Sequence, residues 1–299
     1  MENNQELEQL EINLPKYKSK LESDGFVCIK NVFSKEEIDE FRRLAYLSVG
    51  MNLQGTDLLS NPNLRHVLTD KRIAMIVREL LGDKPIYFGE SKVLVDGVNG
   101  RNGGSIHKDN PDRLNPDGAD WKSEYKVMRF AIYCEDHARH SEGLSVRVGS
   151  HKFPSWQKGK LYHIPSEAGD LIGFYFTTTH CGYSRRTRIV KNLTYAWDNL
   201  QRPLYTKLLK LIPNQLEIPR ERPRIVLFMT FGVKSAILDR YIEYAKQRDY
   251  AVRTWKNLKY TDDTFEFLKD KDIELMDMSV EVEKIDMSKV GKHLDINWK

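Results

Sequence analysis

The sequence contains few cysteines and no long apolar run. Its 299 residues include only three cysteines, at positions 28, 134 and 181. An odd number of widely separated cysteines builds neither a disulfide framework nor a four-thiolate zinc site, so we expect a reducing compartment. No stretch approaches the roughly 20 consecutive apolar residues of a membrane-spanning helix, and residues 1–20 show no secretion signal. The sequence therefore predicts a cytoplasmic protein that does not engage a membrane.

A large charge of one sign is absent as well. The chain has 47 Lys and Arg residues against 43 Asp and Glu residues, which leaves a formal net charge of +4. This excess is too small to indicate nucleic acid as the partner. Glycine and proline are also sparse, at 18 and 11 residues, and 40% of the residues are hydrophobic. These values exclude collagen-like and disordered classes and predict a globular protein with a sizeable core.

Helical patterns precede β patterns along the chain. Residues 1–20 contain Pro15 and show no firm period, so they predict at most a short, loosely held helix. The β-forming residues 25–32 predict a short strand, and Ser34 is the expected N-cap of the helix that follows it. Apolar residues at helical spacing predict a second helix over residues 70–81.

Short β-type runs dominate the next part of the chain. They cover residues 86–95, 127–134, 144–148, 170–177, 188–196 and 224–231. Few long helices separate these runs, so their spacing predicts an antiparallel sandwich or open barrel rather than βαβ units. An insertion over 198–222 is expected to form a lid or a subunit contact. An amphipathic helix is expected over 233–248, followed by a charged tail of uncertain order that continues to residue 299.

Two residues with metal-ligand chemistry lie close together in the sequence. On an extended chain the side chains of His107 and Asp109 leave the same face, so both can reach one ion. One imidazole and one carboxylate make up two thirds of the facial triad that binds non-haem Fe(II). The alternative is that Asp109 caps the turn at Asn110-Pro111 and that His107 is a surface residue.

His180 is the candidate for the third ligand. It is expected to end a strand over residues 171–177, and strand ends converge at the mouth of a β-barrel. Because aromatic residues precede it, a hydrogen-bonded core histidine is the alternative for this position.

Three further residues, His137, His140 and Glu142, could be imagined as a zinc site. Their context is typical of a loop and favours structural or solvent roles instead. His151 follows a turn, so we expect it to orient other groups rather than to bind a metal ion.

An iron centre of this kind would bind a 2-oxo acid cosubstrate, whose distal carboxylate needs a cation. A guanidinium at the start of a strand can bind a carboxylate through two hydrogen bonds. Arg224 opens the apolar run 225–231 and is the best-placed arginine. It could also be a strand end that keeps its charge in solvent, and Arg186 and Arg188 are the alternatives for the anchoring role.

These motifs follow one another in a particular order. The order is Gly25-Phe26-Val27, His107-x-Asp109, the segment EGLSVRVGSHK at 142–152, Gly169-Asp170 and His180. Taken together, they resemble the phytanoyl-CoA dioxygenase family, and the resemblance covers about residues 21–232.

The resemblance implies a mainly β protein with flanking helices around a double-stranded β-helix, which is a jelly-roll and cupin-like core. It implies an oxygenase that uses Fe(II), 2-oxoglutarate and O2. His107, Asp109 and His180 match the family's metal ligands and are the implied catalytic residues. Arg224 most nearly matches its cosubstrate arginine, although many relatives place that arginine closer to the distal histidine, where this sequence has Arg188.

Two further positions bear on the resemblance. Val148 stands where relatives often have proline, which alters a turn but no ligand. Halogenases of the family replace the ligand carboxylate with a small residue, so the presence of Asp109 argues against halogenation.

The implied reaction is the hydroxylation of an unactivated carbon of a small molecule, with release of succinate and CO2. The basic residues in 198–222 could bind an anionic substrate or could simply face solvent; the substrate and the oligomeric state stay open. We expect one oxygenase domain over residues 1–299, with its β-helix core in 21–232 and a helical extension over 233–299. The alternatives are a non-catalytic jelly-roll scaffold with a decayed site and a cupin-like metal isomerase or cosubstrate-independent dioxygenase.

Overall fold

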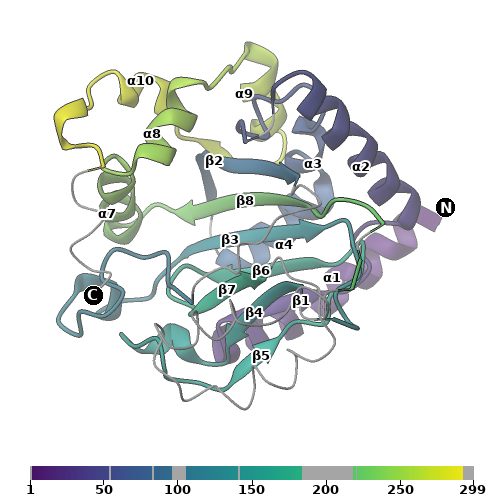
Figure 1. The fold of residues 1–299 in the computed structure, drawn as a ribbon, viewed down its shortest axis with the longest axis horizontal. Helices are drawn as coiled ribbons and strands as arrows, with labels where there is room; N and C mark the ends of the chain where they lie inside the picture. Colours follow the sequence, from purple (N-terminus) through teal and green to yellow (C-terminus); the bar gives the residue numbers. More distant parts are fainter. Residues whose placement is uncertain are drawn as a thin grey trace.

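The larger of two β-sheets forms the centre of the molecule (Figure 1). The structure is a computed structural model that describes residues 2–53, 55–82, 84–95, 106–140, 142–183, 218–219 and 221–291. The sheet has six strands in the order β1 (Phe26–Ile29), β6 (Leu171–Tyr175), β3 (Val127–Tyr133), β8 (Ile225–Val233), β2 (Pro85–Val95) and β9 (Glu274–Leu275). All neighbours pair antiparallel except β9, which runs parallel to β2.

A second, antiparallel sheet has three strands. Their order is β5 (Leu161–His163), β4 (Gly143–Arg147) and β7 (His180–Tyr183). A core of buried side chains from both sheets joins them, with Leu144 and Val146 of β4 against Phe174 of β6 and Val226 of β8. Two packed, mainly antiparallel sheets agree with the predicted sandwich, and the arrangement is compatible with a jelly-roll core.

The other face of the larger sheet is covered by N-terminal helices. These are α1 (Glu2–Asp24), α2 (Lys35–Gly50), α3 (Arg65–Leu68) and α4 (Lys71–Leu81), and Figure 1 shows α1 and α4 behind the strands. Side chains alternate between the two faces, so that Phe130 packs toward the helices while Ala131 packs toward the second sheet. Ser34 caps α2 as predicted, in a capping box with Glu37.

The prediction for the first residues is wrong. Helix α1 is 23 residues long and continues through Pro15. Two of its leucines, Leu14 and Leu21, are buried in the core that it shares with α4 and the sheet. The free energy of this burial outweighs the hydrogen bond that proline removes from the helix.

The C-terminal part of the chain is also more ordered than expected. Its described residues form the helices α7 (Ala236–Ala245), α8 (Asp249–Lys256), α9 (Asp262–Lys269) and α10 (Met278–Val282), followed by a 3-10 turn at Met287–Lys289. Two further 3-10 turns lie earlier in the chain, at Ala119–Trp121 and Ser150–Lys152. Trp255 of α8 is completely buried, and its indole nitrogen donates a hydrogen bond to the carbonyl oxygen of Phe88 on β2. This packing joins the extension to the end of the larger sheet.

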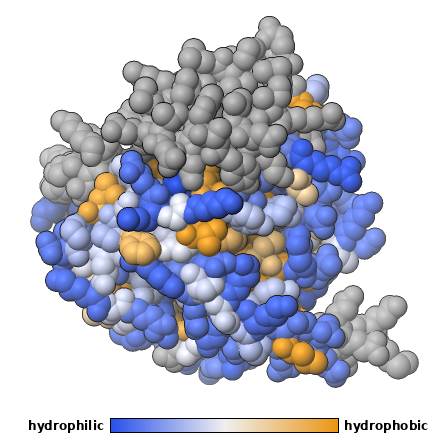
Figure 2. All heavy atoms as spheres, turned by 90° about the horizontal axis from the view of Figure 1, so that it is seen from below, coloured by the Kyte–Doolittle hydropathy of each residue, from blue (hydrophilic) through white to orange (hydrophobic). Residues whose placement is uncertain are grey.

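Five of the six predicted β runs coincide with β2, β3, β4, β6 and β8. The run at 188–196, and the insertion at 198–222 except for residues 218, 219, 221 and 222, lie outside the described residues. Within the described part of the chain, no helix is both long enough and apolar enough to cross a membrane. Figure 2 shows one face of the molecule, on which the described residues are mostly hydrophilic with separate hydrophobic positions among them.

Candidate metal centre

Main-chain hydrogen bonds bring two distant segments, 107–109 and 176–180, together. The backbone amides and carbonyls of His107 and His180 bond to each other in both directions, each at 2.9 Å. The amide of Asp109 donates to the carbonyl oxygen of Phe176, also at 2.9 Å. His180 begins β7 after a turn, so it does not end the preceding strand as the sequence had indicated. The extended segment 107–109 therefore lies directly beside the start of β7.

This arrangement places the three candidate ligands around one point. One ligand atom each of His107, Asp109 and His180 lies within 4.8 Å of the others. His107 Nε2 is 3.6 Å from Asp109 Oδ1, and His180 Nε2 is 3.7 Å from Asp109 Oδ2. In the described ranges, no other set of three His, Cys, Asp or Glu side chains is grouped in this way. Asp109 and His180 are buried and His107 is half-buried, so the group is approached from the side of His107.

The tautomer of His180 suits metal binding. Its Nδ1 atom is 3.0 Å from the carbonyl oxygen of Thr178. A carbonyl oxygen only accepts, so Nδ1 of the neutral ring carries the proton and Nε2 keeps its lone pair toward Asp109. Burial, together with neighbouring His107, lowers the pKa of His180 to about 3, against the opposing effect of the Asp109 carboxylate.

Asp109 is ionised in this environment. Burial alone would raise the pKa of its carboxyl group, but Arg129, His180 and His107 outweigh burial and lower the pKa well below its ordinary value. Neutral imidazoles and an ionised carboxylate are the protonation states that a divalent ion requires.

The donor set fits a ferrous ion. Two imidazole nitrogens and one carboxylate are the ligands of the facial triad in non-haem Fe(II) enzymes, which leaves further coordination positions open. Asp109 Oδ2 is a buried oxygen that accepts no hydrogen bond, although Arg129 Nη1 lies 3.0 Å away in an ion pair. A metal ion would satisfy this atom.

Several more charged side chains surround Asp109. Arg129 of β3 lies between Asp109 and Glu90. The pKa of Lys92 is lowered by burial and by nearby Arg129. The guanidinium of Arg248 lies over the ring of Tyr250 at 4.5 Å, and its Nε and Nη1 atoms are buried without a hydrogen-bond acceptor. The centre is therefore rich in positive charge even before a metal ion is counted.

Of the predicted anchoring arginines, only Arg224 lies among the described residues. Arg224 directly precedes β8 and lies six residues before Thr230, whose hydroxyl faces Arg129 at 3.5 Å. Because side chains alternate, Arg224 is on the same face of the strand as Val226 and Thr230, which is the face toward the second sheet. Arg186 and Arg188 lie outside the described residues.

The other histidines have different surroundings. His137 and His140 are buried, with ring centroids 5.6 Å apart, and they form no metal-type group with Glu142 in the part of the chain that the structure describes. His151 stacks on Tyr175 with centroids 5.5 Å apart, and its Nε2 atom lies 3.2 Å from the carbonyl oxygen of Glu22. It therefore connects the segment after β4 to the end of α1.

Arg129 and Glu90 are not among the site residues that the sequence predicted. The available signal was a single arginine at an inward position of the otherwise apolar run 127–133. A charge at such a position is costly to bury unless it is paired. The pattern thus predicts a buried partner, but it does not say which one.

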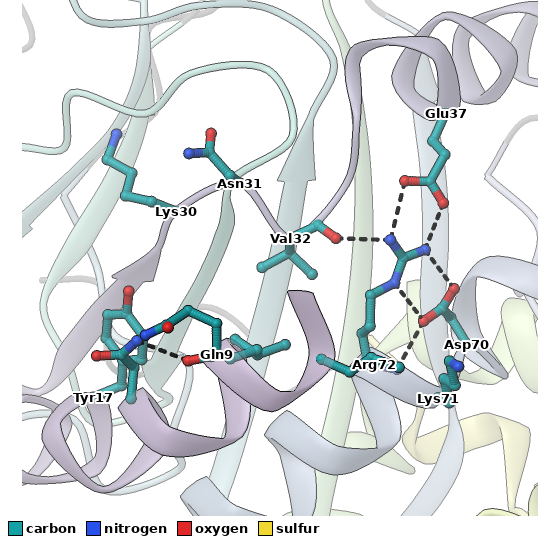
Figure 3. A pocket seen from close by; sticks show the side chains of 12 residues that line it. Gln9, Tyr17, Lys30, Asn31, Val32, Glu37, Asp70, Lys71 and Arg72 are labelled. Atoms are coloured by element: carbon teal, nitrogen blue, oxygen red, sulfur yellow. Dashed lines mark hydrogen bonds and ion pairs between the residues drawn. The ribbon is translucent and has the colours of Figure 1, made fainter. Parts of the chain in front are cut away.

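A separate pocket near α1 and α4 is structural (Figure 3). Its arginine, Arg72, donates to Asp70, to Glu37 and to the carbonyl oxygen of Val32. All three nitrogens of this guanidinium have acceptors, so the group joins the segment after β1 to α2 and α4 rather than presenting a cation to a ligand.

The sequence matches no family model and no curated protein. The fold, however, is similar to several solved structures. The non-heme alpha ketoglutarate dependent epimerase SnoN from nogalamycin biosynthesis is 16% identical over 74% of this chain and 82% of that chain, with a TM-score of 0.50. EctD from S. alaskensis with 2-oxoglutarate and 5-hydroxyectoine is 14% identical over 73% and 75%, with a TM-score of 0.50. AviO1 from Streptomyces viridochromogenes Tue57 is 13% identical over 74% and 96%, with a TM-score of 0.50. At these identities the similarity is one of fold.

Proposed function

We propose that this protein is a non-haem Fe(II)- and 2-oxoglutarate-dependent dioxygenase that hydroxylates a carbon of a small molecule. The observation that carries the proposal is the grouping of His107, Asp109 and His180 within 4.8 Å. The fold supports it, because SnoN is an alpha ketoglutarate dependent epimerase and EctD was solved with 2-oxoglutarate. On this proposal residues 1–299 act as one oxygenase domain.

The three side chains would hold the iron on one face and leave the opposite face to cosubstrate and O2. Bound iron with 2-oxoglutarate and O2 supplies the oxidising power for C–H hydroxylation, with succinate and CO2 as the co-products. The protein's contribution is to bind and orient. Main-chain bonds fix segment 107–109 against β7, and Thr178 fixes the imidazole of His180.

Arg224 and Arg188 are the proposed anchors for the distal carboxylate of 2-oxoglutarate. A guanidinium suits this role because it binds a carboxylate through two parallel hydrogen bonds. The resemblance to the phytanoyl-CoA dioxygenase family supports the assignment of Arg224, which stands directly before the apolar run 225–231 and most nearly matches the family's cosubstrate arginine. Arg188 is the alternative, because it lies closer to His180 in the sequence, as the cosubstrate arginine does in many members of the family.

The proposed substrate is a small molecule with an anionic group, and we propose neither nucleic acid nor a membrane as a partner. Arg248 supports an anionic group, because two of its buried nitrogens have no acceptor and a buried donor without one is costly. The cytoplasmic location is part of the same proposal.

A non-catalytic jelly-roll protein is the second candidate. One observation favours it: Arg129 Nη1 lies 3.0 Å from Asp109 Oδ2, so a guanidinium already neutralises the carboxylate without a metal ion. A scaffold could use this ion pair for stability alone.

Anaerobic titration separates the two candidates. The enzyme should bind Fe(II), and addition of 2-oxoglutarate should give a saturable visible charge-transfer band that Asp109→Ala lacks. Under O2, succinate release should be coupled to O2 uptake across a panel of anionic and neutral small molecules. A wild-type protein that binds neither Fe(II) nor 2-oxoglutarate would exclude the oxygenase and leave the scaffold.

A further inference from the structure

Two buried charged side chains connect Asp109 to the C-terminal helices. We propose that Glu90, acting through Arg129, is a positioning residue that keeps Asp109 available to a divalent ion, and that α7 and α8 hold Glu90 in place. The inference rests on the proposed function and deepens it, because it assigns a role in metal binding to a carboxylate that is not a ligand.

The two carboxylate oxygens of Asp109 have different neighbours. Its Oδ2 atom lies 3.0 Å from Arg129 Nη1, whereas its Oδ1 atom lies nearest His107 Nε2, at 3.6 Å. The guanidinium therefore restricts the rotation of the carboxylate, with Oδ1 toward His107 and Oδ2 toward His180. The positive guanidinium of Arg129 also competes with a metal ion for the carboxylate, and it repels the metal ion.

On its other side, Arg129 forms an ion pair with Glu90. Arg129 Nη2 lies 2.5 Å from Glu90 Oε1, and the two side chains are only 16% and 10% exposed. The guanidinium is also enclosed by the ring of Phe176, whose centroid is 4.8 Å from its central carbon. Screening by water is weak in such surroundings, so Glu90 cancels much of the charge of Arg129 that Asp109 and a metal ion would otherwise experience.

Glu90 is in turn held by hydrogen bonds from two tyrosines of the C-terminal helices. The hydroxyl of Tyr241 on α7 donates to Glu90 Oε2 at 2.7 Å, and the hydroxyl of Tyr250 on α8 donates to Oε1 at 3.3 Å. The pairing of β2 with β8 shifts register between Tyr87 and Ser91, where Gly89 has a φ of 70°. This β-bulge turns Glu90 toward Arg129 and the two tyrosines.

These contacts form a continuous chain from two helices to the metal ligand. With Glu90 present, Arg129 can orient Asp109 without adding a full positive charge at the centre. Without Glu90, the whole charge of Arg129 would act on Asp109, and the carboxylate would prefer the guanidinium to the metal ion. Groups that orient a ligand in this way typically change metal affinity by about 10- to 100-fold.

The test measures Mn²⁺ affinity by electron paramagnetic resonance on the full chain, for four proteins: wild type, Glu90→Gln, Arg129→Gln and the double variant. Glu90→Gln should weaken Mn²⁺ binding by about 10- to 100-fold. In the Arg129→Gln background, the same Glu90 substitution should have less than about a threefold effect, because the group through which it acts is gone. Thermal unfolding shows that each variant is folded.

A matched control is available at the other end of the same sheet. Glu135 also pairs with an arginine, Arg42, at 2.9 Å. Glu135→Gln alters this second glutamate–arginine pair, six residues along the chain from Arg129, and should leave Mn²⁺ affinity unchanged. Tyr241→Phe removes only the hydroxyl that donates to Glu90, so it should weaken Mn²⁺ binding by a smaller factor than Glu90→Gln. If Glu90→Gln does not fold, Tyr241→Phe tests the inference in its place.

The outcomes separate this inference from the proposed function. A wild-type protein that binds no Mn²⁺ overturns both. A wild-type protein that binds Mn²⁺ overturns only the inference if Glu90→Gln and Tyr241→Phe bind it equally well. An equal loss of affinity in both Arg129 backgrounds also overturns it, since Glu90 would then act independently of Arg129.

Discussion

The Nζ atom of Lys108 lies 2.5 Å from the carbonyl oxygen of Thr177, three residues before His180. It also donates to the carbonyl oxygen of Ser150 at 2.8 Å, and the side chain is completely buried. Lys108 stands between His107 and Asp109, so on an extended segment it points away from the metal side. Lys108 therefore joins segment 107–109, which carries two of the candidate ligands, to the turn that precedes His180.

Lys108→Met should destabilise the protein. The substitution removes this donor from the carbonyl oxygen of Thr177, and it leaves the carbonyl oxygen of Ser150 with the amide of Phe153. A buried carbonyl that loses its donor costs about 1–3 kcal/mol. Urea unfolding monitored by tryptophan fluorescence measures the change. Lys234→Met is the control, because the side chain of Lys234 is 73% exposed and its loss should change stability by less than about 0.5 kcal/mol. Equal stabilities of the two variants would contradict the assigned role.

Asp109→Asn should abolish metal binding. The amide keeps the shape of the carboxylate but removes the charge, so the affinity for Mn²⁺ should fall by more than about 100-fold, a loss larger than that expected for a residue outside the ligand set. Asp117→Asn, on the exposed loop before Trp121, is the control and should bind as wild type. Isothermal titration measures both. Unchanged affinity of Asp109→Asn would remove Asp109 from the ligand set.

Arg224→Gln should weaken the binding of 2-oxoglutarate and leave Mn²⁺ binding unchanged. Loss of a bidentate ion pair with a carboxylate should raise the dissociation constant of 2-oxoglutarate at saturating Mn²⁺ by at least about tenfold. Arg188→Gln, measured in parallel, decides between the two arginines. If only Arg188→Gln weakens the binding of 2-oxoglutarate, Arg188 is the anchor. Arg224 is then a strand-end residue that keeps its charge in solvent.

Gly25→Ala should be strongly destabilising. Gly25 has a φ of 84°, and an added Cβ atom would lie 2.4 Å from Nδ1 of His151 and 2.8 Å from Oγ1 of Thr178. Both the left-handed backbone and the overlap oppose the methyl group, so a loss of about 1–3 kcal/mol is expected. Gly50→Ala meets no atom within 4 Å and should be neutral or slightly stabilising. The difference in melting temperature between the two variants is the measurement.

Stability should fall in acid partly because of His151. Burial lowers the pKa of this residue to about 4, helped by Lys152 and opposed by the carbonyl of Glu22 and by Asp24. The unfolded chain then binds a proton below a pH of about 6.5 that the folded protein does not accept until a pH near 4. The stabilising contribution is therefore complete above pH 6.5 and is lost as the pH falls through this window.

The measurement is the free energy of unfolding of wild type and His151→Gln between pH 4 and pH 7. The variant should show the smaller decrease toward low pH, because it removes the group that titrates. His66→Gln, at an exposed position of α3, should follow wild type. Parallel curves for wild type and His151→Gln would show that other groups cause the acid sensitivity.

Part of the fold was predictable because local patterns decide it. The alternation of apolar residues marks β3 and β8, and Ser34 marks the start of α2, since capping is settled within one turn. Helix α1 was not predictable in this way. Pro15 argues against a continuous helix locally, and only the burial of Leu21 against the sheet and α4 reverses that preference.

The candidate site divides along the same line. The chemical types at positions 107, 109 and 180, and the spacing of the first two, are properties of the sequence and were sufficient to predict a His-Asp-His group. The partners of the carboxylate were not. Glu90 and Arg129 are 39 positions apart, and Tyr241 is 151 positions from Glu90.

The sequence by itself determined which side chains could bind a metal ion and where β1, β2, β3, β4, β6 and β8 would form. Only the tertiary structure decided that Arg129 would be shared between Asp109 and Glu90, and that α7 and α8 would support the pair. The physical reason is that hydrophobic periodicity and ligand chemistry act over a few neighbouring residues. A buried ion-pair network instead depends on strand register, on a β-bulge and on the packing of distant helices, none of which a short stretch of sequence specifies.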